Sequence, residues 1–215
     1  MMQQKQYLNS FLIVGILFFV LLIGCSSKDS FNNVKIGNQT WMTENLNVST
    51  FRNGDSIPEA KTDEEWEKAG MDDTPAWCYY DNDPANGKKY GKLYNWYAVA
   101  DPRGLAPEGW HMPGDAEWSQ LTDYLGGEAE AKMKSTSGWN SNRNGTNKSG
   151  FSGLPGGSRY PYGNFYTLGV LGYWWSSTEY NTADAWYRSM SSDVGNVYRH
   201  DNKKDYGFSV RCIRD

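Results

Sequence analysis

Large aromatic rings separated by glycine-rich turns dominate this sequence, and that combination most restricts the folds open to it. Phe, Trp and Tyr make up 15% of the chain, which contains 23 glycines among its 215 residues. The chain has no internal repeat, no low-complexity block and no heptad pattern. Large rings bury much apolar surface per residue, and glycines allow tight turns. We therefore expect one loop-rich domain held together by aromatic packing rather than by long helices.

The order of the local signals along the chain predicts an α+β fold. A capping box formed by Thr62 and Glu65, with Gly70 as the stop, predicts a helix over residues 63–69. Helical spacing or helix-start signals also mark residues 90–100, 115–125 and 128–134, whereas strand-like patterns mark residues 34–48 (two strands around a Gly37-Asn38 turn), 76–81, 172–180, 185–191, 196–201 and 207–215. Helices that mostly precede a run of antiparallel strands indicate α+β.

The first residues have the features of an export signal. The apolar run over residues 11–23 is too short to span a bilayer comfortably and follows the positive charge of Lys5. The segment that ends in Gly24-Cys25 resembles a bacterial lipobox, which implies removal of residues 1–24 and lipidation of Cys25. Residues 25–32 would then form a tether. The alternatives are an ordinary signal peptide or a short membrane anchor.

This resemblance implies an outer-membrane lipoprotein of the bacterial cell envelope, held to the membrane by acyl chains. Ser27-Lys28-Asp29 loosely resembles the lysine-plus-acid export signal of Bacteroidetes surface lipoproteins, which would place the domain at the cell surface. Without residues 1–24 the chain has 191 residues and a formal charge of −5. A mildly acidic chain without a basic run argues against binding to nucleic acid or to anionic lipid.

The two remaining cysteines allow two interpretations. Outside the cytoplasm, Cys78 and Cys212 can form a disulfide that closes a long loop, worth about 4 kcal/mol in the chain-entropy model. Alternatively, both are buried free thiols. The sequence leaves this choice open because it does not supply the distance between the two Cα atoms.

Seven ordered motifs resemble the Fibrobacter succinogenes major paralogous domain over about residues 33–215. These are GNQTWMTENLNV, WCYYDNDPANGKKYGKLYNWYA, GWHMPGDAEWSQLTDYLGG, FSGLPGGSRY, GYWWSSTEY, AWYRSM and YGFSVRCIRD. HMPGDAEW and the terminal GFSVRCIRD are also similar to segments of formylglycine-generating enzymes. That similarity implies a C-type-lectin-like fold, with two main helices beside a twisted antiparallel sheet, long irregular loops and neighbouring termini.

Few residues suit catalysis or metal binding. Formylglycine-generating activity needs reactive cysteines near the substrate groove, and no cysteine lies in or after GYWWSSTEY before Cys212. We therefore expect no enzyme activity and no cofactor. His111 and His200 are expected to be structural and surface side chains. Asp81 and Asp83 are only weak calcium candidates, because the spacing of oxygen ligands in their loop fails that of an EF-hand.

The pair Trp174-Trp175 raises the question of what covers each ring. Neighbouring residues on a strand point to opposite faces, so we expect one indole in the core. The other, with Tyr173 and Tyr180, would stack on a sugar ring or a protein epitope, or would pack under a neighbouring loop.

Residues 173–206 have the composition of a recognition surface. Half of these residues are Tyr, Asn, Ser or Asp, a mixture that resembles an antibody paratope, although a polar sheet face with its turns has the same composition. The resemblance to C-type-lectin-like domains also implies variable residues near the C-terminus. The predicted binding face comprises Tyr180, Asn181, Asp184, Trp186, Tyr187, Asn196, Tyr198, His200 and Asn202. Strand alternation should turn roughly half of these residues inward, and one of the adjacent Trp186 and Tyr187 should be buried.

Together these features predict an envelope lipoprotein whose single domain is a non-catalytic binding module for a protein or a glycan. Two alternatives remain open at this point. One is an enzyme that acts on envelope or environmental glycans, and the other is a structural component of fimbriae or adhesins.

Overall fold

The computed structural model describes residues 31–193 and 195–215 and combines short helices with antiparallel strands. The predicted signal peptide, Cys25 and most of the predicted tether lie outside these residues. Phe31, the first described residue, packs edge-on against Trp110, with ring centroids 6.3 Å apart. In the described residues, no helix has the length and apolar character needed to cross a membrane.

The helices agree with the predicted ones except in two segments: α2 was not predicted, and the helix over residues 90–100 differs. They are α1 (Asp63–Met71), α2 (Pro84–Tyr90), α3 (Trp96–Val99), α4 (Asp115–Leu125) and α5 (Ala129–Met133). The predicted helix over residues 90–100 is wrong, because Leu93–Tyr94 form strand β4 and only α3 is helical there. Asn95 causes the break: its side-chain oxygen accepts from the N–H of Ala98, as an N-cap, and from the N–H of Ala76.

The strands are short at the start of the chain and long near its end. They are β1 (Asn33–Ile36), β2 (Gln39–Met42), β3 (Trp77–Cys78), β4 (Leu93–Tyr94), β5 (Trp110–His111), β6 (Ser158–Arg159), β7 (Phe165–Tyr166), β8 (Leu171–Glu179), β9 (Asp184–Ser191), β10 (Tyr198–Lys203) and β11 (Ile213–Arg214). The segment 207–215, predicted as a strand, pairs continuously only at β11. Its earlier residues form isolated bridges, such as Phe208 with Tyr94 and Ser209 with Trp174.

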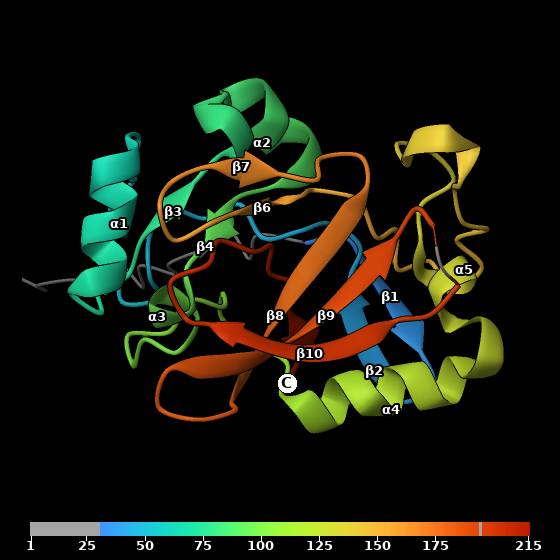
Figure 1. Cartoon of the computed structure of the whole chain (residues 1–215). Coiled ribbons are helices and arrows are strands. Elements are labelled where there is room, and N and C mark those ends of the chain that lie inside the picture. The colour runs from blue at the N-terminus through green and yellow to red at the C-terminus, as the bar shows by residue number, and fades with distance from the viewer. Residues whose placement is uncertain (1–30, 194) are drawn as a thin grey trace, which may run out of the picture. The chain divides into compact units, whose positions relative to one another are not determined.

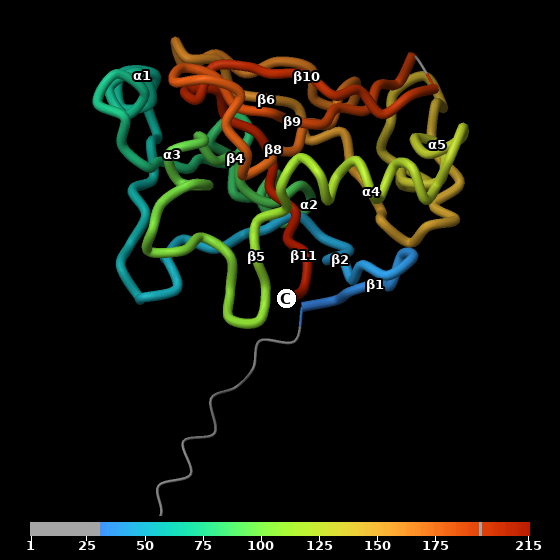
Figure 2. The backbone as a smooth tube through the Cα atoms, turned by 90° about the horizontal axis from the view of Figure 1, so that it is seen from below, coloured from blue at the N-terminus to red at the C-terminus, as the bar shows by residue number. Residues whose placement is uncertain are grey.

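The longest strands form the antiparallel sheet β10-β9-β8, and a second sheet has the order β1-β2-β11-β5. Figure 1 shows the three long strands side by side, with α4 along one side of them and the β6–β7 hairpin on the other. In the second sheet β2 pairs with both β1 and β11, so the start and the end of the described fold are neighbours (Figure 2). This arrangement is α+β, as predicted.

Strand β8 separates two hydrophobic cores, which explains the Trp174-Trp175 pair. Trp175 packs with Tyr94 and Phe208 in one core, and Trp174 packs with Trp118 in the other. Both indoles are at most 1% exposed, and each donates a hydrogen bond, Trp174 to the side-chain oxygen of Asn45 and Trp175 to the carbonyl of Tyr94. The rings alternate between faces as predicted, but neither remains for a ligand, because both faces of β8 are covered.

Cys78 and Cys212 do not form a disulfide, and both are buried free thiols. Cys78 lies in a small cluster around Trp66 and Tyr80, whereas Cys212 lies in the core that contains Trp175. Burial raises the pKa of each thiol to about 12, so both stay protonated at neutral pH. The second interpretation of the cysteines, as small apolar core residues, is therefore the one that the structure supports.

Candidate binding surface

Seven aromatic side chains from separate segments meet beside the β10-β9-β8 sheet. We call them the tyrosine surface: Tyr160, Tyr166, Tyr173, Tyr187, Tyr198, His200 and Tyr206. They come from the β6–β7 hairpin, from each strand of the sheet and from the turn that follows β10. Tyr160, Tyr166 and His200 are exposed, and the others are partly buried.

Phe208, which is buried, forms the floor of the tyrosine surface. Its ring stacks on Tyr173 with centroids 4.8 Å apart, and lies 4.9 Å from Tyr187 and 5.8 Å from Tyr206. From this floor the rings continue in two directions. Tyr206, Tyr160 and Tyr166 follow one another at 4.9 and 4.4 Å, and Tyr187, His200 and Tyr198 at 6.1 and 5.6 Å. The result is a continuous row of rings.

Arg159 holds the β6–β7 hairpin, and with it Tyr160 and Tyr166, against the start of α1. The guanidinium is fully buried and donates to the carbonyl oxygens of Ala60 and Thr62 and, within the hairpin, of Gly163. It also contacts the carboxylate of Asp63 at 3.2 Å. Gly163 has a φ of +96°, a conformation that favours glycine, and an added Cβ would lie 2.3 Å from the Asp63 carboxylate. Arg159 on one side of the turn and Gly163 on the other thus both lie against the start of α1.

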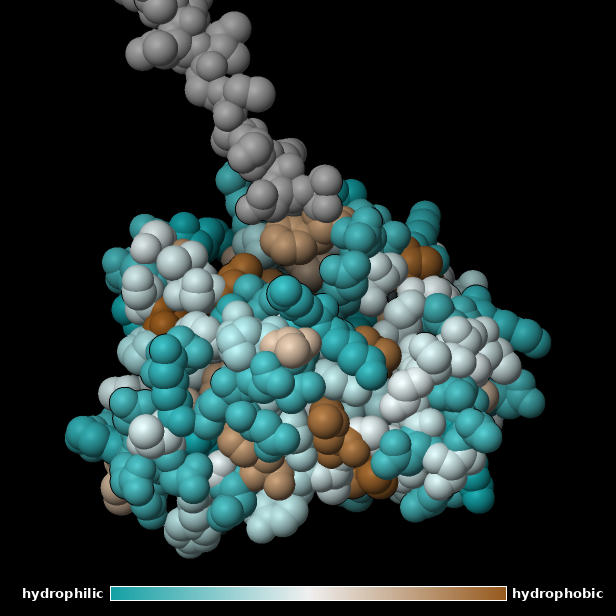
Figure 3. All heavy atoms as spheres, turned by 90° about the horizontal axis from the view of Figure 1, so that it is seen from above, coloured by the Kyte–Doolittle hydropathy of each residue, from teal (hydrophilic) through white to brown (hydrophobic). Residues whose placement is uncertain are grey.

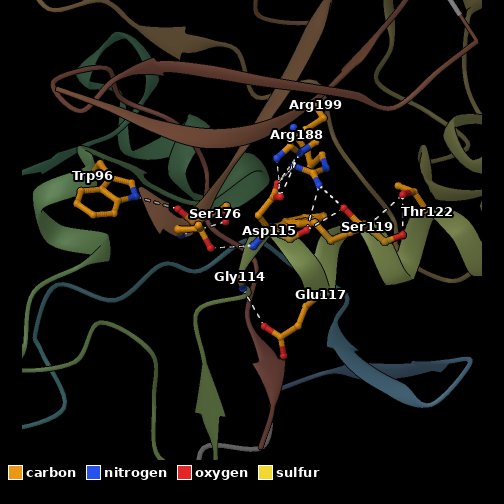
Figure 4. A network of polar contacts seen from close by, with 11 residues as sticks. Trp96, Gly114, Asp115, Glu117, Ser119, Thr122, Ser176, Arg188 and Arg199 are labelled. Carbon is orange, nitrogen blue, oxygen red and sulfur yellow. Dashed lines mark hydrogen bonds and ion pairs between the residues drawn. The ribbon is translucent and has the colours of Figure 1, made fainter. Parts of the chain in front are cut away.

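Asp115 at the start of α4 anchors the other side of the sheet (Figure 4). Its carboxylate bonds to the buried guanidinium of Arg188 on β9 at 2.8 Å and to Arg199 on β10 at 2.8 Å. Arg188 also donates to the Ser119 hydroxyl at 3.0 Å, and the Thr178 hydroxyl accepts from the backbone N–H of Asp115. These contacts tie all three long strands to one helix end, so the tyrosine surface has a rigid support.

The partly buried phenols of Tyr173, Tyr187 and Tyr206 remain neutral at physiological pH. Burial raises the pKa of Tyr187 to about 12 and also raises the pKa of Tyr173 and Tyr206 above the ordinary value. Each hydroxyl is therefore both a donor and an acceptor beside an apolar ring. Such side chains give contact area and adaptable hydrogen bonds at a low cost in conformational entropy.

The nine residues of the predicted binding face do not form one face. Tyr187, Tyr198, His200 and Asn202 lie on the side of the sheet that carries the tyrosine surface, whereas Asp184 and Trp186 point to the other side. Tyr180 and Asn181 lie in the β8–β9 turn, and Asn196 lies in the β9–β10 loop. Strand alternation divides neighbouring residues between opposite sides, as expected, so only four of the nine lie on the side of the tyrosine surface.

Trp186 and Asn181 serve local structure. The Trp186 ring lies between Tyr180, edge-on at 4.8 Å, and Arg199, whose guanidinium carbon is 3.4 Å from the ring centroid. Asn181 accepts from the backbone N–H groups of Ala183 and Asp184, which closes the turn. We expected one of Trp186 and Tyr187 to be buried, but both are only partly buried, because β9 has partners on each face.

The remaining candidate residues also have structural contacts. Asp83 caps α2 by accepting from the N–H of Ala85 at 2.8 Å, and Asp81 lies in a 3-10 turn with a φ of +53°. His111 bonds to the carboxylates of Glu117 and Asp215. In the part of the chain that the structure describes, no three His, Cys, Asp or Glu side chains cluster in a way that would hold a metal ion.

Sequence reasoning missed Tyr160 and Tyr166, which are among the most exposed members of the tyrosine surface. Their signal is the tyrosine-rich hairpin over residues 158–166, in which Tyr160, Tyr162 and Tyr166 surround a glycine turn. The exposed fractions are 37% for Tyr160, 69% for Tyr162 and 45% for Tyr166. Seen from above, strongly hydrophobic residues form only small, separate patches (Figure 3). Amphipathic rings, rather than an aliphatic patch, therefore distinguish this region.

Comparison with known proteins agrees with the motifs. Residues 34–214 match the family described as the Fibrobacter succinogenes major domain, which covers nearly all of the folded part. The chain belongs to the Fibrobacter succinogenes major domain family. No match was found among curated proteins. Membership of the Fibrobacter succinogenes major domain family establishes the domain and leaves its ligand to be inferred from the structure.

Proposed function

We propose that this protein is an outer-membrane lipoprotein of the bacterial cell envelope whose domain binds a protein or a glycan without catalysis. The tyrosine surface is the observation that carries this proposal. Its seven rings come from segments distant in the sequence and remain partly open to solvent, and three of them, Tyr173, Tyr187 and Tyr206, pack on Phe208. Tyrosine is among the residues that most often dominate binding energy at protein interfaces.

The proposed fold is C-type-lectin-like. Three features support it: α1 and α4 are the longest helices of the described fold, the sheet β10-β9-β8 lies between long irregular connections, and β2 pairs with both β1 and β11. Under this proposal the tyrosine surface occupies the sheet and loops near the C-terminus, the region that we expected to vary.

The position of the tyrosine surface suits a protein attached through its N-terminal end. In Figure 2 the described fold begins next to the C-terminus, and β6, β9 and β10 lie on the opposite side of the domain. An anchor at Cys25, followed by the short tether, would leave the tyrosine surface facing away from the membrane. This geometry supports a ligand outside the membrane to which the lipoprotein is attached.

The test begins with a soluble form, residues 29–215, screened against arrays of glycans and envelope or host proteins. For any ligand found, Tyr166→Ala and Tyr198→Ala should each weaken binding, by about 2 kcal/mol if the residue is a hot spot. Tyr124→Ala is the matched control, since Tyr124 is 66% exposed on α4 and lies outside the tyrosine surface.

Thermal unfolding of each variant separates lost contacts from lost folding. Tyr187 is a poor test residue, because it packs on Phe208 and its removal would also disturb the core. Unchanged affinity in both test variants would show that the ligand binds elsewhere. Turnover of a bound glycan would instead favour the enzyme alternative.

A further inference from the structure

A polar pocket of about 390 Å³ lies away from the tyrosine surface and shares no residue with it. Its walls come from the segment after β2, from α2 and the turn that follows it, and from residues of the long connection between α5 and β6. The lining residues are Thr43, Glu44, Asn45, Asn47, Gly87, Lys88, Lys89, Gly91, Ser135, Ser152 and Leu154. This volume falls in the range of small-molecule sites.

Behind Asn45 lies a buried cation that has no carboxylate partner in the described residues. The side-chain oxygen of Asn45 accepts from Arg211 Nη2 at 2.6 Å and Nε at 3.1 Å. Arg211 is fully buried, and its other acceptors are the backbone carbonyls of Met42 and Phe151. Burial lowers the pKa of Arg211 to about 9, so the guanidinium keeps its positive charge at neutral pH.

Asn47 has the same relation to a second buried cation. Its side-chain oxygen accepts from Lys92 Nζ at 3.0 Å, and its backbone carbonyl accepts from the same ammonium at 3.1 Å. Lys92 is 4% exposed and packs over the ring of Trp77 at 4.1 Å. No ion pair joins Lys92 to any residue in the described part of the chain. Both amide side chains in the pocket wall therefore shield an unneutralised positive charge.

The charge around the pocket is positive in a protein whose formal net charge is −4. Lys88 and Lys89 are exposed among the lining residues, and neither forms an ion pair with a described residue. Glu44 is the one acidic side chain in the lining, and it accepts from the Asn32 amide. Two exposed and two buried cations thus surround or underlie the pocket, and their combined field favours an anion.

The hydrogen-bonding groups of the pocket add a second preference. The side-chain oxygens of Asn45 and Asn47 accept hydrogen bonds from the buried cations. Their NH2 groups therefore point away from the cations and donate to the carbonyl oxygens of Tyr90 and Gly87, respectively. Each amide has a second N–H with no acceptor in the described residues. The hydroxyls of Thr43, Ser135 and Ser152 also line the pocket. A ligand that presents acceptors and hydroxyls matches this set of groups.

We propose that this pocket binds a small hydroxylated carboxylate of sugar size, such as a uronic acid. The carboxylate would lie near Lys88 and Lys89, where the field of Arg211 and Lys92 also attracts it. The ring hydroxyls would meet the amides and hydroxyls of the wall. This site is independent of the tyrosine surface, so failure of either proposal leaves the other intact.

The experiment titrates glucuronate and galacturonate into the soluble form, whose folded unit begins at Phe31, with nuclear magnetic resonance as the readout. We expect the side-chain amide signals of Asn45 and Asn47 to shift, and binding to weaken with added salt. Lys88→Gln/Lys89→Gln should weaken binding at least fivefold. Lys35→Gln/Lys203→Gln is the matched control, because it removes the same charge from exposed lysines outside the pocket.

Four results would overturn the proposal. Glucose binding as tightly as glucuronate would show that charge is not recognised. Sulfate binding without any uronate binding would reduce the pocket to a general anion site. Signal shifts confined to the tyrosine surface, or unchanged affinity in the lysine double variant, would place the uronate site elsewhere.

Discussion

His111 joins strand β5 to helix α4 and to the last residue of the chain. Its Nδ1 lies 2.8 Å from the carboxylate of Asp215, and its Nε2 lies 2.8 Å from that of Glu117. Burial opposes protonation of the ring, but the hydrogen bonds to the two carboxylates outweigh burial and raise the pKa of His111 above its ordinary value. The histidine that we expected to be merely structural is thus a titratable link between elements.

The stability of the domain should depend on pH through this residue. A pKa that is higher in the folded than in the unfolded state stabilises the fold fully below the unfolded pKa of about 6.5, and this contribution is lost as pH rises through the folded pKa. We expect the free energy of unfolding, measured by urea titration, to fall as the pH rises from about 6.5 through the folded pKa of His111. His111→Gln should flatten this part of the curve.

His200 supplies the control for the pH experiment. It is exposed on β10, and no ion pair joins it to a described residue. His200→Gln should therefore keep the decline seen in the unaltered protein. An identical decline in the His111 and His200 variants would contradict the assignment to His111.

At the scale of elements, the start of α4 is the main anchor of the β10-β9-β8 sheet. Asp115 bonds to Arg188, whose side chain is 2% exposed, and to Arg199, whose side chain is 45% exposed. The same carboxylate thus serves one buried and one exposed cation. These two pairs differ in energy because solvent screens only the exposed one.

Removal of Asp115 should destabilise the domain far more than removal of Arg199. Asp115→Ala leaves the guanidinium of Arg188 buried and unpaired, which we expect to cost about 3 kcal/mol or more. Arg199→Gln removes an exposed partner and should cost less than about 1 kcal/mol. Urea denaturation of the two variants measures both values. Equal decreases in the free energy of unfolding would show that the buried pair of Asp115 and Arg188 contributes no more than the exposed pair.

At the scale of the whole molecule, the position of the tyrosine surface bears on the proposed attachment through Cys25. The segments that carry the tyrosine surface lie on the side opposite the start of the described fold (Figure 2). The proposed role of the tyrosine surface in a membrane-attached protein depends on lipidation of Cys25.

Lipidation is tested by Cys25→Ala in the full-length chain. We expect the unaltered protein to sediment with membranes and to carry acyl chains on Cys25, which mass spectrometry of the N-terminal peptide detects. The variant should lose the acyl chains and leave the membrane fraction. Sedimentation of both proteins with membranes would instead favour the alternative of a short membrane anchor.

Features that depend on neighbouring residues were predictable from the sequence. The Thr62–Glu65 capping box starts α1, and the Gly37-Asn38 turn joins β1 to β2, because both signals act within a few residues. The family and the α+β class were also predictable, since ordered motifs and the order of helices and strands can be read from the sequence without knowing which residues are in contact. The helix predicted over residues 90–100 failed where Asn95 bonds to Ala76, a residue outside that local window.

Contacts between distant residues could be learned only from the folded chain. Arg211 reaches Asn45 across 166 positions, and the rings of Tyr160 and Tyr206 meet across 46 positions. Alternation along β8 predicted that Trp174 and Trp175 diverge, but it contains no information about the two cores that cover them. Burial and charge compensation depend on which distant segments pack together, and local sequence patterns do not specify those contacts. The tyrosine surface and the cationic pocket therefore emerged only from packing in three dimensions.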